Sequence, residues 1–319
     1  MKVIHIPDTI EINDDIRSLT SVVCHSLSDV PDIIDTWNEG KVVDIEGYYE
    51  NAKINRVYVD RVHVKKAFAE YTAAYNADDP KIKLKIDHTY RVAALCERIA
   101  KAAGMSAYDI ELAWLSGMLH DVGRFEQIKR YNTFSDADSV DHAKFGADLL
   151  FKDGLISTFL KGMVKCTGYK PGALEDRYDS DGVFLYDRLN KSDMEMLELA
   201  IRCHNMYRIP QGLNCREQAF CNVLRDADKV DIFKVNIDTP LEEIYNTTTE
   251  ELMKSDITDE VLKAFDEEHC ILKAIRRTPA DTVIGHVSLA YELVYDESVR
   301  ITVEQGYLAK LMHFHSDNE

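Results

Sequence analysis

A histidine and an aspartate lie side by side at positions 120 and 121, near the end of the apolar run LAWLSGMLHDVGRF. The chain has 11 histidines, so about one His-Asp dipeptide is expected by chance. The setting is more informative, because burying an imidazole and a carboxylate in an apolar helix is costly unless a partner compensates them. A divalent metal ion is such a partner, and Gly123 would let the backbone or a ligand approach closely. His120 and Asp121 are therefore candidate metal ligands.

Four further side chains of ligand chemistry occur where an apolar helical pattern turns polar, namely His88, His142, His204 and Asp228. Each alone would more often be a structural histidine or a helix-capping acid. Five such positions on five successive predicted helices favour one shared site. In the run RDAD, Asp226 competes with Asp228 for the last position.

The elements that carry these residues are predicted to be helices. Pro80 opens a helix whose apolar residues recur at helical spacing until Gly104 stops it. Ser106 and Asp109 form a capping pair for the next helix, and a further helix is expected at 141–154. We therefore predict an all-α helical bundle over 61–319.

The first 60 residues differ from the rest of the chain. MKVIHI, KVVDIE and NRVYVD are short alternating segments separated by polar stretches. They predict a short, irregular or partly β N-terminal extension over 1–60.

Composition narrows the class of function. The 319-residue chain has a formal net charge of -18, which argues against bulk nucleic-acid binding and against anionic membranes. Its start does not resemble a signal peptide, and no apolar run is long enough for a transmembrane helix. Seven scattered cysteines without a CxxC are typical of reduced thiols, so we expect a cytoplasmic protein whose oligomeric state stays open.

The order His88, His120-Asp121, Asp228 resembles the HD superfamily of metal-dependent phosphohydrolases. The runs HDVGRFEQ, DHAKFGADLL, AIRCHN and RDADKVDIF are similar to a bacterial, HDIG-like branch of it. The resemblance covers about residues 61–312. It implies an HD-domain helical bundle that hydrolyses a phosphomonoester or phosphodiester, with a nucleotide or another small phosphate ester as substrate.

The resemblance also implies ligand roles. His88, His120, Asp121 and Asp228 would hold one divalent transition metal ion, which is Fe, Mn, Zn, Co or Ni. His142 and His204 match the extra histidines of family members that hold two ions bridged by the aspartate of the pair. The family motif places the last ligand directly after the alanine, which favours Asp228.

Basic and polar residues near the ligands are candidates for substrate binding. Arg124 follows the pair by three residues, and arginine binds phosphate oxygens well, so Arg124 is the first choice. Arg91, Gln127 and Lys144 come next. We interpret Lys85, Arg225 and Lys229 as solvated helix charges. Catalysis is expected from a metal-activated hydroxide, with Asp121 holding the ions and Arg124 the phosphate.

Two alternatives from other classes stay open. The ligand order also resembles a diiron HD-fold oxygenase, although the motifs around its ligands differ from HDVGRFEQ. A catalytically silent regulatory HD module would usually lack one or more ligands, whereas every candidate is present here. Hydrolysis of cyclic dinucleotides is not expected, because Asn205 follows His204 where that subgroup has a different signature.

Overall fold

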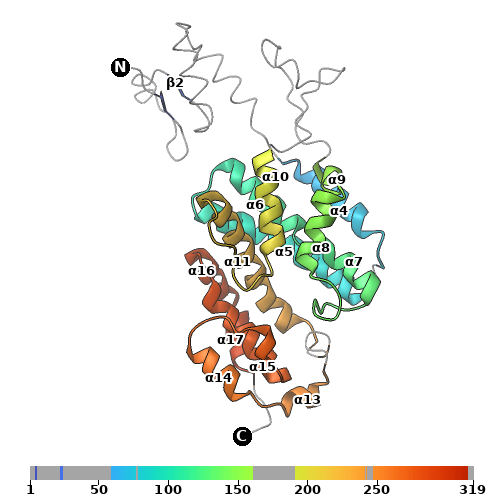
Figure 1. The fold of residues 1–319 in the computed structure, drawn as a ribbon, viewed down its shortest axis with the longest axis vertical. Coiled ribbons are helices and arrows are strands. Elements are labelled where there is room, and N and C mark those ends of the chain that lie inside the picture. Colours follow the sequence, from blue (N-terminus) through green and yellow to red (C-terminus); the bar gives the residue numbers. More distant parts are fainter. Residues whose placement is uncertain are drawn as a thin grey trace. The chain divides into compact units, whose positions relative to one another are not determined.

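The computed structural model describes residues 4–5, 22–23, 59–76, 78–160, 191–240, 242 and 247–314. The chain divides into two compact units, Met1–Asp60 with Gly162–Arg188, and Arg61–Lys161 with Leu189–Glu319. In the first, the strands β1 (Ile4–His5) and β2 (Val22–Val23) pair in parallel. The strands expected at 41–46 and 55–58 lie outside the described residues. The described part of the second unit is helical, which confirms the all-α prediction (Figure 1).

The predicted limits at Pro80, Gly104 and Ser106 are confirmed, whereas the helix that carries His120 ends at Leu119 and Gly123 lies inside the next helix. After α4 (Arg61–Thr72), helix α5 (Pro80–Ala102) has proline at its first position and Asp79 as its cap. Gly104 adopts the left-handed conformation with φ +71°, which lets the Met105 N–H donate to the Ala100 carbonyl. Helix α6 (Ala107–Leu119) then starts at Ser106, whose hydroxyl accepts from the Asp109 N–H.

Helices α5 and α6 pack unusually closely at one glycine. A Cβ atom on Gly117 would lie 2.6 Å from the Cα of Ala93 and 2.9 Å from its backbone nitrogen. Only a residue without a side chain allows the two backbones to approach in this way. The contact brings the middle of α5 against the last turn of α6.

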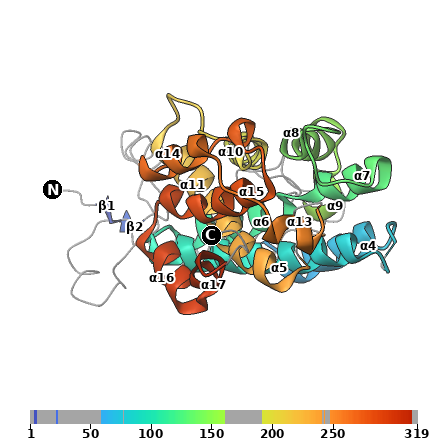
Figure 2. The ribbon, with the colours of Figure 1, turned by 90° about the horizontal axis from the view of Figure 1, so that it is seen from below.

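The remaining central helices surround this pair (Figures 1 and 2). They are α7 (Val122–Tyr131), α8 (His142–Ala147), the π-helical turn η2 (Asp148–Lys152), α9 (Ile156–Leu160), α10 (Lys191–Cys203) and α11 (Cys215–Asp238). Helix α11 packs on α5, α6 and α10, and α8 packs on α7 and α10. The helix predicted at 141–154 is thus α8 continued by the π turn. None of the described helices is long and apolar enough to cross a membrane.

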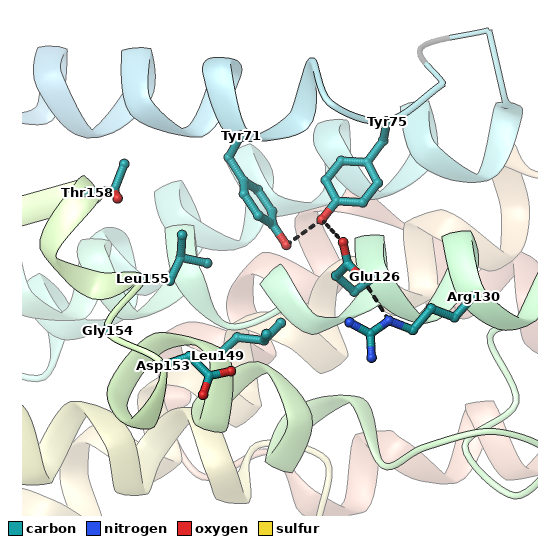
Figure 3. A pocket seen from close by; sticks show the side chains of 9 residues that line it. All are labelled: Tyr71, Tyr75, Glu126, Arg130, Leu149, Asp153, Gly154, Leu155 and Thr158. Carbon is teal, nitrogen blue, oxygen red and sulfur yellow. Dashed lines mark hydrogen bonds and ion pairs between the residues drawn. The ribbon is translucent and has the colours of Figure 1, made fainter.

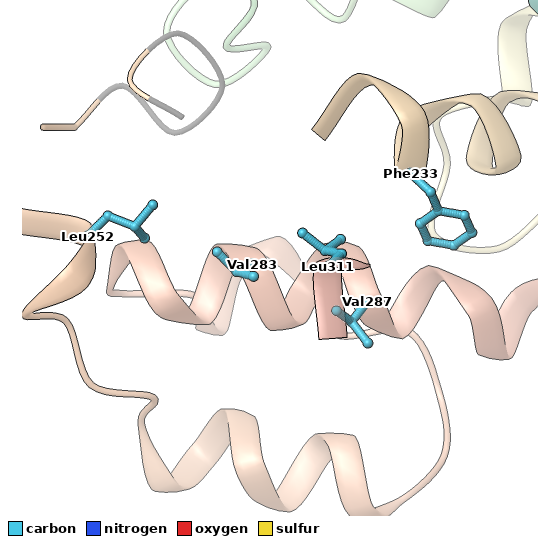
Figure 4. Close-up of a cluster of buried hydrophobic side chains, with 5 residues drawn as sticks. All are labelled: Phe233, Leu252, Val283, Val287 and Leu311. Carbon is cyan, nitrogen blue, oxygen red and sulfur yellow. The ribbon is translucent and has the colours of Figure 1, made fainter. Parts of the chain in front are cut away.

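The C-terminal elements pack on the end of α11. They are α13 (Thr249–Met253), α14 (Asp259–Asp266), the 3₁₀ turn η4 (Lys273–Ile275), α15 (Pro279–Val287), the 3₁₀ turn η5 (Ser288–Glu292), α16 (Asp296–Gln305) and α17 (Tyr307–Met312). Their shared core joins Phe233 of α11 to Leu252, Val283, Val287 and Leu311 (Figure 4). Residues 249–312 therefore extend the helical bundle and share a hydrophobic core with α11.

The close α5–α6 contact makes Gly117→Ala a test of the fold. Both clashing atoms belong to helix backbones, so the helices must separate, and we expect a loss of roughly 2–3 kcal/mol in the free energy of unfolding. Urea unfolding of Gly212→Ala is the control, because a Cβ at Gly212 meets nothing within 4 Å and only its φ of +80° is unfavourable. That control should lose about 1 kcal/mol. Equal losses would contradict the close packing.

Candidate metal centre

His120 and Asp121 occupy the junction between α6 and α7. Every residue from Leu112 to Leu119 is buried, so the helix delivers the pair into the interior. His120 and Asp121 are 0% and 2% exposed. Asp121 is the N-cap residue of α7, yet its side chain makes no capping hydrogen bond. Its carboxylate is therefore available to other partners.

The other candidate ligands come from four further places in the bundle. His88 lies in the middle of α5 and Asp228 in the middle of α11, while His142 begins α8 and His204 follows α10. All four side chains point toward the His-Asp pair, as the distances below show. The three histidines are almost fully buried, and the Asp228 side chain is 15% exposed.

His88, His120 and Asp228 form the first ligand group. The Nε2 atoms of the two histidines are 3.3 Å apart, and Asp228 Oδ1 lies 3.1 Å from His88 Nε2. Oδ2 of Asp121 lies 3.6 Å from His88 Nε2 and 3.5 Å from His120 Nε2. Four ligand atoms thus surround one point.

His142 and His204 form the second group. Their Nε2 atoms are 3.1 Å apart. The other oxygen of Asp121, Oδ1, lies 3.6 Å from His142 Nε2 and 3.8 Å from His204 Nε2. One carboxylate therefore turns one oxygen to each histidine pair.

The second ring nitrogens fix the protonation pattern of the histidines. Nδ1 of His120 lies 2.7 Å from the Gly117 carbonyl, and Nδ1 of His204 lies 2.7 Å from the Ile201 carbonyl. A carbonyl oxygen only accepts hydrogen bonds, so both Nδ1 atoms carry the proton. Nε2 of a neutral ring then has an unshared lone pair.

Carboxylates fix the other two rings in the same way. Asp231 Oδ2 accepts from His88 Nδ1 at 2.6 Å, and Asp136 Oδ2 accepts from His142 Nδ1 at 2.7 Å. Carboxylates in this position orient histidines that bind metals. Within each pair of rings, the two Nε2 atoms face each other.

Two lone pairs at 3.1–3.3 Å repel unless a cation lies between them. Burial lowers the pKa of His120 to about 4 and that of His142 to about 3, so neither ring holds a second proton at neutral pH. A set of imidazole and carboxylate ligands suits a borderline divalent cation. The residues present therefore fit such an ion.

The carboxylates of the centre are ionised. Burial alone would raise the pKa of Asp121, but Lys85, His120 and His142 hold it well below the usual range. Burial acts in the same direction on Asp228, where the hydrogen bond with His88 outweighs it and lowers the pKa. Negative charge is therefore present where a cation would bind.

The comparison with protein families agrees with this geometry. The family model for the HD domain matches residues 86–319. The chain belongs to the HD domain family. No curated protein and no solved structure gives a match. The family and the cluster of histidines and aspartates together indicate a metal-dependent, hydrolase-type function.

Within the HD domain, the two aspartates of the run RDAD have different partners. Asp226 is fully buried and accepts from the backbone N–H groups of Val294 and Tyr295 at 2.9–3.1 Å. It fixes the segment before α16. Asp228 is the one that lies among the histidines.

Arg91 contacts the centre through a carboxylate. Its Nε lies 2.6 Å from Asp231 Oδ1 and its Nη2 lies 2.9 Å from Asp231 Oδ2, which makes a bidentate pair. Asp231 in turn orients His88. A contact between Arg91 and substrate stays a prediction.

Asp136 connects several residues of the site, and no sequence pattern distinguished it from its acidic neighbours. Besides His142, it accepts from Arg124 Nη1 at 3.0 Å, Gln127 Nε2 at 3.0 Å and Asn205 Nδ2 at 3.2 Å. Burial alone would raise its pKa, but the hydrogen bond with His142 and the charge of Arg124 lower it. The Asp136 carboxylate therefore orients both His142, a candidate metal ligand, and Arg124, a candidate substrate-binding residue.

The remaining predicted substrate contacts differ in position. Arg124 is 12% exposed. Its Nε is buried 3.8 Å from Asp121 Oδ1 and has no hydrogen-bond partner among the described residues. Gln127 is fully buried and donates to Ser139 and the Val140 carbonyl. Lys144 is 58% exposed and pairs with Asp141. Their roles toward substrate stay predictions.

The interpretation of three basic residues as solvated charges is wrong. Lys85 Nζ lies 2.7 Å from Asp121 Oδ2, and its side chain is only 16% exposed. Arg225 is buried and donates to the His204 carbonyl at 3.3 Å, and Lys229 is buried and donates to the Glu292 carbonyl at 3.3 Å. Each of these three cations is largely shielded from solvent and has a hydrogen-bond acceptor within the protein. For Lys85, the one-turn spacing before His88 was a usable signal.

A cavity of about 500 Å³ lies on another side of α7, between α4 and the turn before α9 (Figure 3). Tyr71 donates to the Val122 carbonyl at 3.0 Å, and Tyr75 lies 2.9 Å from both Tyr71 and Glu126. Arg130 donates to Glu126 at 2.9 Å. These polar groups bind one another and tie α4 to the start of α7, which directly follows Asp121.

The lowered histidine pKa values predict how stability depends on pH. His120 and His142 have an ordinary pKa of 6.5 when unfolded but about 4 and about 3 when folded. Between pH 6.5 and 5 only the unfolded chain takes up these protons, so stability falls as pH falls, by roughly 2 kcal/mol per histidine. The pKa of His88 is raised despite burial, because of its hydrogen bonds with Asp228 and Asp231, so His88 adds no loss of stability in this window.

Urea unfolding of metal-free protein at pH 7 and pH 5 measures this effect. His120→Gln should lose less stability between the two values than the unmodified protein. Stability that stays constant or rises toward pH 5 would contradict the neutral state of these rings.

Proposed function

We propose that the protein is a metal-dependent phosphohydrolase that holds two divalent cations and cleaves small phosphate esters. The observation that carries the proposal is the position of Asp121. Its Oδ2 faces His88 and His120 at 3.5–3.6 Å, and its Oδ1 faces His142 and His204 at 3.6–3.8 Å. This is the arrangement that a carboxylate bridging two ions requires.

Bound divalent cations would supply a nucleophile at neutral pH, since they lower the pKa of bound water to about 7, and they would neutralise phosphate charge. The ions suited to imidazole and carboxylate ligands are Fe, Mn, Zn, Co and Ni. We propose a nucleotide, or a similar small phosphorylated molecule, as substrate.

The chain's own residues have separate roles in this proposal. Asp231 and Asp136 keep His88 and His142 in the required tautomer. Arg124 has an Nε–H beside Asp121 that makes no hydrogen bond within the described part of the chain, and this group would donate to a phosphate oxygen. Asp228 is the most exposed of the six ligand candidates, so the substrate would enter on its side.

Replacing Asp121 and Arg124 separates metal binding from substrate binding. Asp121→Ala should lose bound metal and activity together, because both ions would lose a shared ligand. Arg124→Ala should keep its metal and lower kcat/KM by about 10- to 100-fold, the effect of one charged hydrogen bond. Arg124→Lys should lose less. Elemental analysis and phosphate release are the measurements.

The same measurements distinguish the alternatives. An Arg124→Ala protein that is fully active would contradict the role of Arg124. A protein that contains iron, consumes dioxygen and releases no phosphate would contradict hydrolysis altogether.

A further inference from the structure

Two cations from different helices approach the same carboxylate. Lys85 of α5 lies 2.7 Å from Asp121 Oδ2, and Arg124 of α7 lies 3.8 Å from Asp121 Oδ1. Both also lie over the ring of Phe134, at 5.4 Å and 5.7 Å from its centroid. The two side chains are 16% and 12% exposed. They therefore lie together beside Asp121 and Phe134 and are largely shielded from solvent.

Each of these cations has hydrogen-bonding capacity left. An ammonium group has three N–H donors, and the described residues give Lys85 one acceptor, Asp121. The Nε–H of Arg124 has no acceptor in the described part of the chain. A buried donor without an acceptor is unfavourable, and an anionic ligand beside Lys85 and Arg124 would supply the missing acceptor.

The charge and the number of oxygens then restrict the ligand. A phosphate monoester presents three non-bridging oxygens and two negative charges, whereas a diester presents two such oxygens and one charge. Because two cations lie beside Asp121, a dianionic ligand gains about twice as much electrostatic attraction from them as a monoanionic one.

We infer that Lys85 and Arg124 form a paired anion-binding site and that the substrate is a phosphate monoester, whose terminal phosphate is a dianion, rather than a diester. This rests on the proposed hydrolysis. In that reaction the oxygen of water forms a bond to phosphorus, the ester P–O bond breaks, and the proton from water ends on the leaving alcohol. Lys85 and Arg124 bind the non-bridging oxygens throughout.

Lys85→Met tests the inference, with Lys83→Met as a matched control on the same helix. The Lys83 side chain is 69% exposed and pairs with Asp87. Isothermal titration of metal-loaded protein with inorganic phosphate should show about 10- to 100-fold weaker binding for Lys85→Met. Lys83→Met should bind like the unmodified protein, Lys85→Arg should recover part of the affinity, and metal content should be the same in all four proteins.

Turnover adds a second readout. With nitrophenyl phosphate and bis(nitrophenyl) phosphate as substrates, the unmodified protein should prefer the monoester, and Lys85→Met should lose most of that preference. Unchanged phosphate affinity in Lys85→Met, a fall in its metal content, or a preference for the diester would each overturn the inference. Phosphate binding that depends on Lys85 without hydrolysis of any ester would instead refute the proposed hydrolysis and leave the anion site standing.

Discussion

Four buried imidazoles whose Nε2 atoms meet in two pairs are the arrangement on which the rest of this structure depends. The Nε2 atoms of His88 and His120 are 3.3 Å apart, and those of His142 and His204 are 3.1 Å apart. Burial lowers the pKa of His120 and of His142, so one ring of each pair carries no second proton at neutral pH. An interior that holds such groups is unfavourable unless a cation joins them. The helices that deliver the rings therefore act as a scaffold for a cation-binding site.

The scaffold orients the rings by two different devices. His120 and His204 follow helices, and each caps its own helix by donating from Nδ1 to the carbonyl three residues earlier. His88 and His142 do not lie at the C-terminal end of a helix, and carboxylates orient their rings instead. Gly117 belongs to both the fold and the site, because it allows α5 to approach α6 and its carbonyl fixes the His120 ring. Packing and ligand geometry are thus coupled at one residue.

The sequence was sufficient for the helical class, for the limits of α5 and α6, and for the residues that the structure brings together. Those features depend on local signals, such as Pro80, Gly104 and the apolar run before His120. The partners of the ligands were harder to predict. Asp136 lies in a polar loop without periodicity, and its role arises only because α8 and the end of α10 meet there. Lys85 was taken for a surface charge, since a single lysine on a helix gives no sign that a carboxylate 36 residues away will bind it.

The central claim is that cations belong between the paired rings, with Asp121 shared by both. Anomalous diffraction from crystals grown with Mn²⁺ tests it most directly. The account predicts one anomalous peak among His88, His120 and Asp228 and a second between His142 and His204, each about 2.0–2.3 Å from an oxygen of Asp121. A single peak in the first group would support metal binding but contradict the claim that Asp121 is shared by two ions. A fully occupied crystal with no peak near either pair, and rings turned so that Nε2 donates to a protein acceptor, would contradict the account.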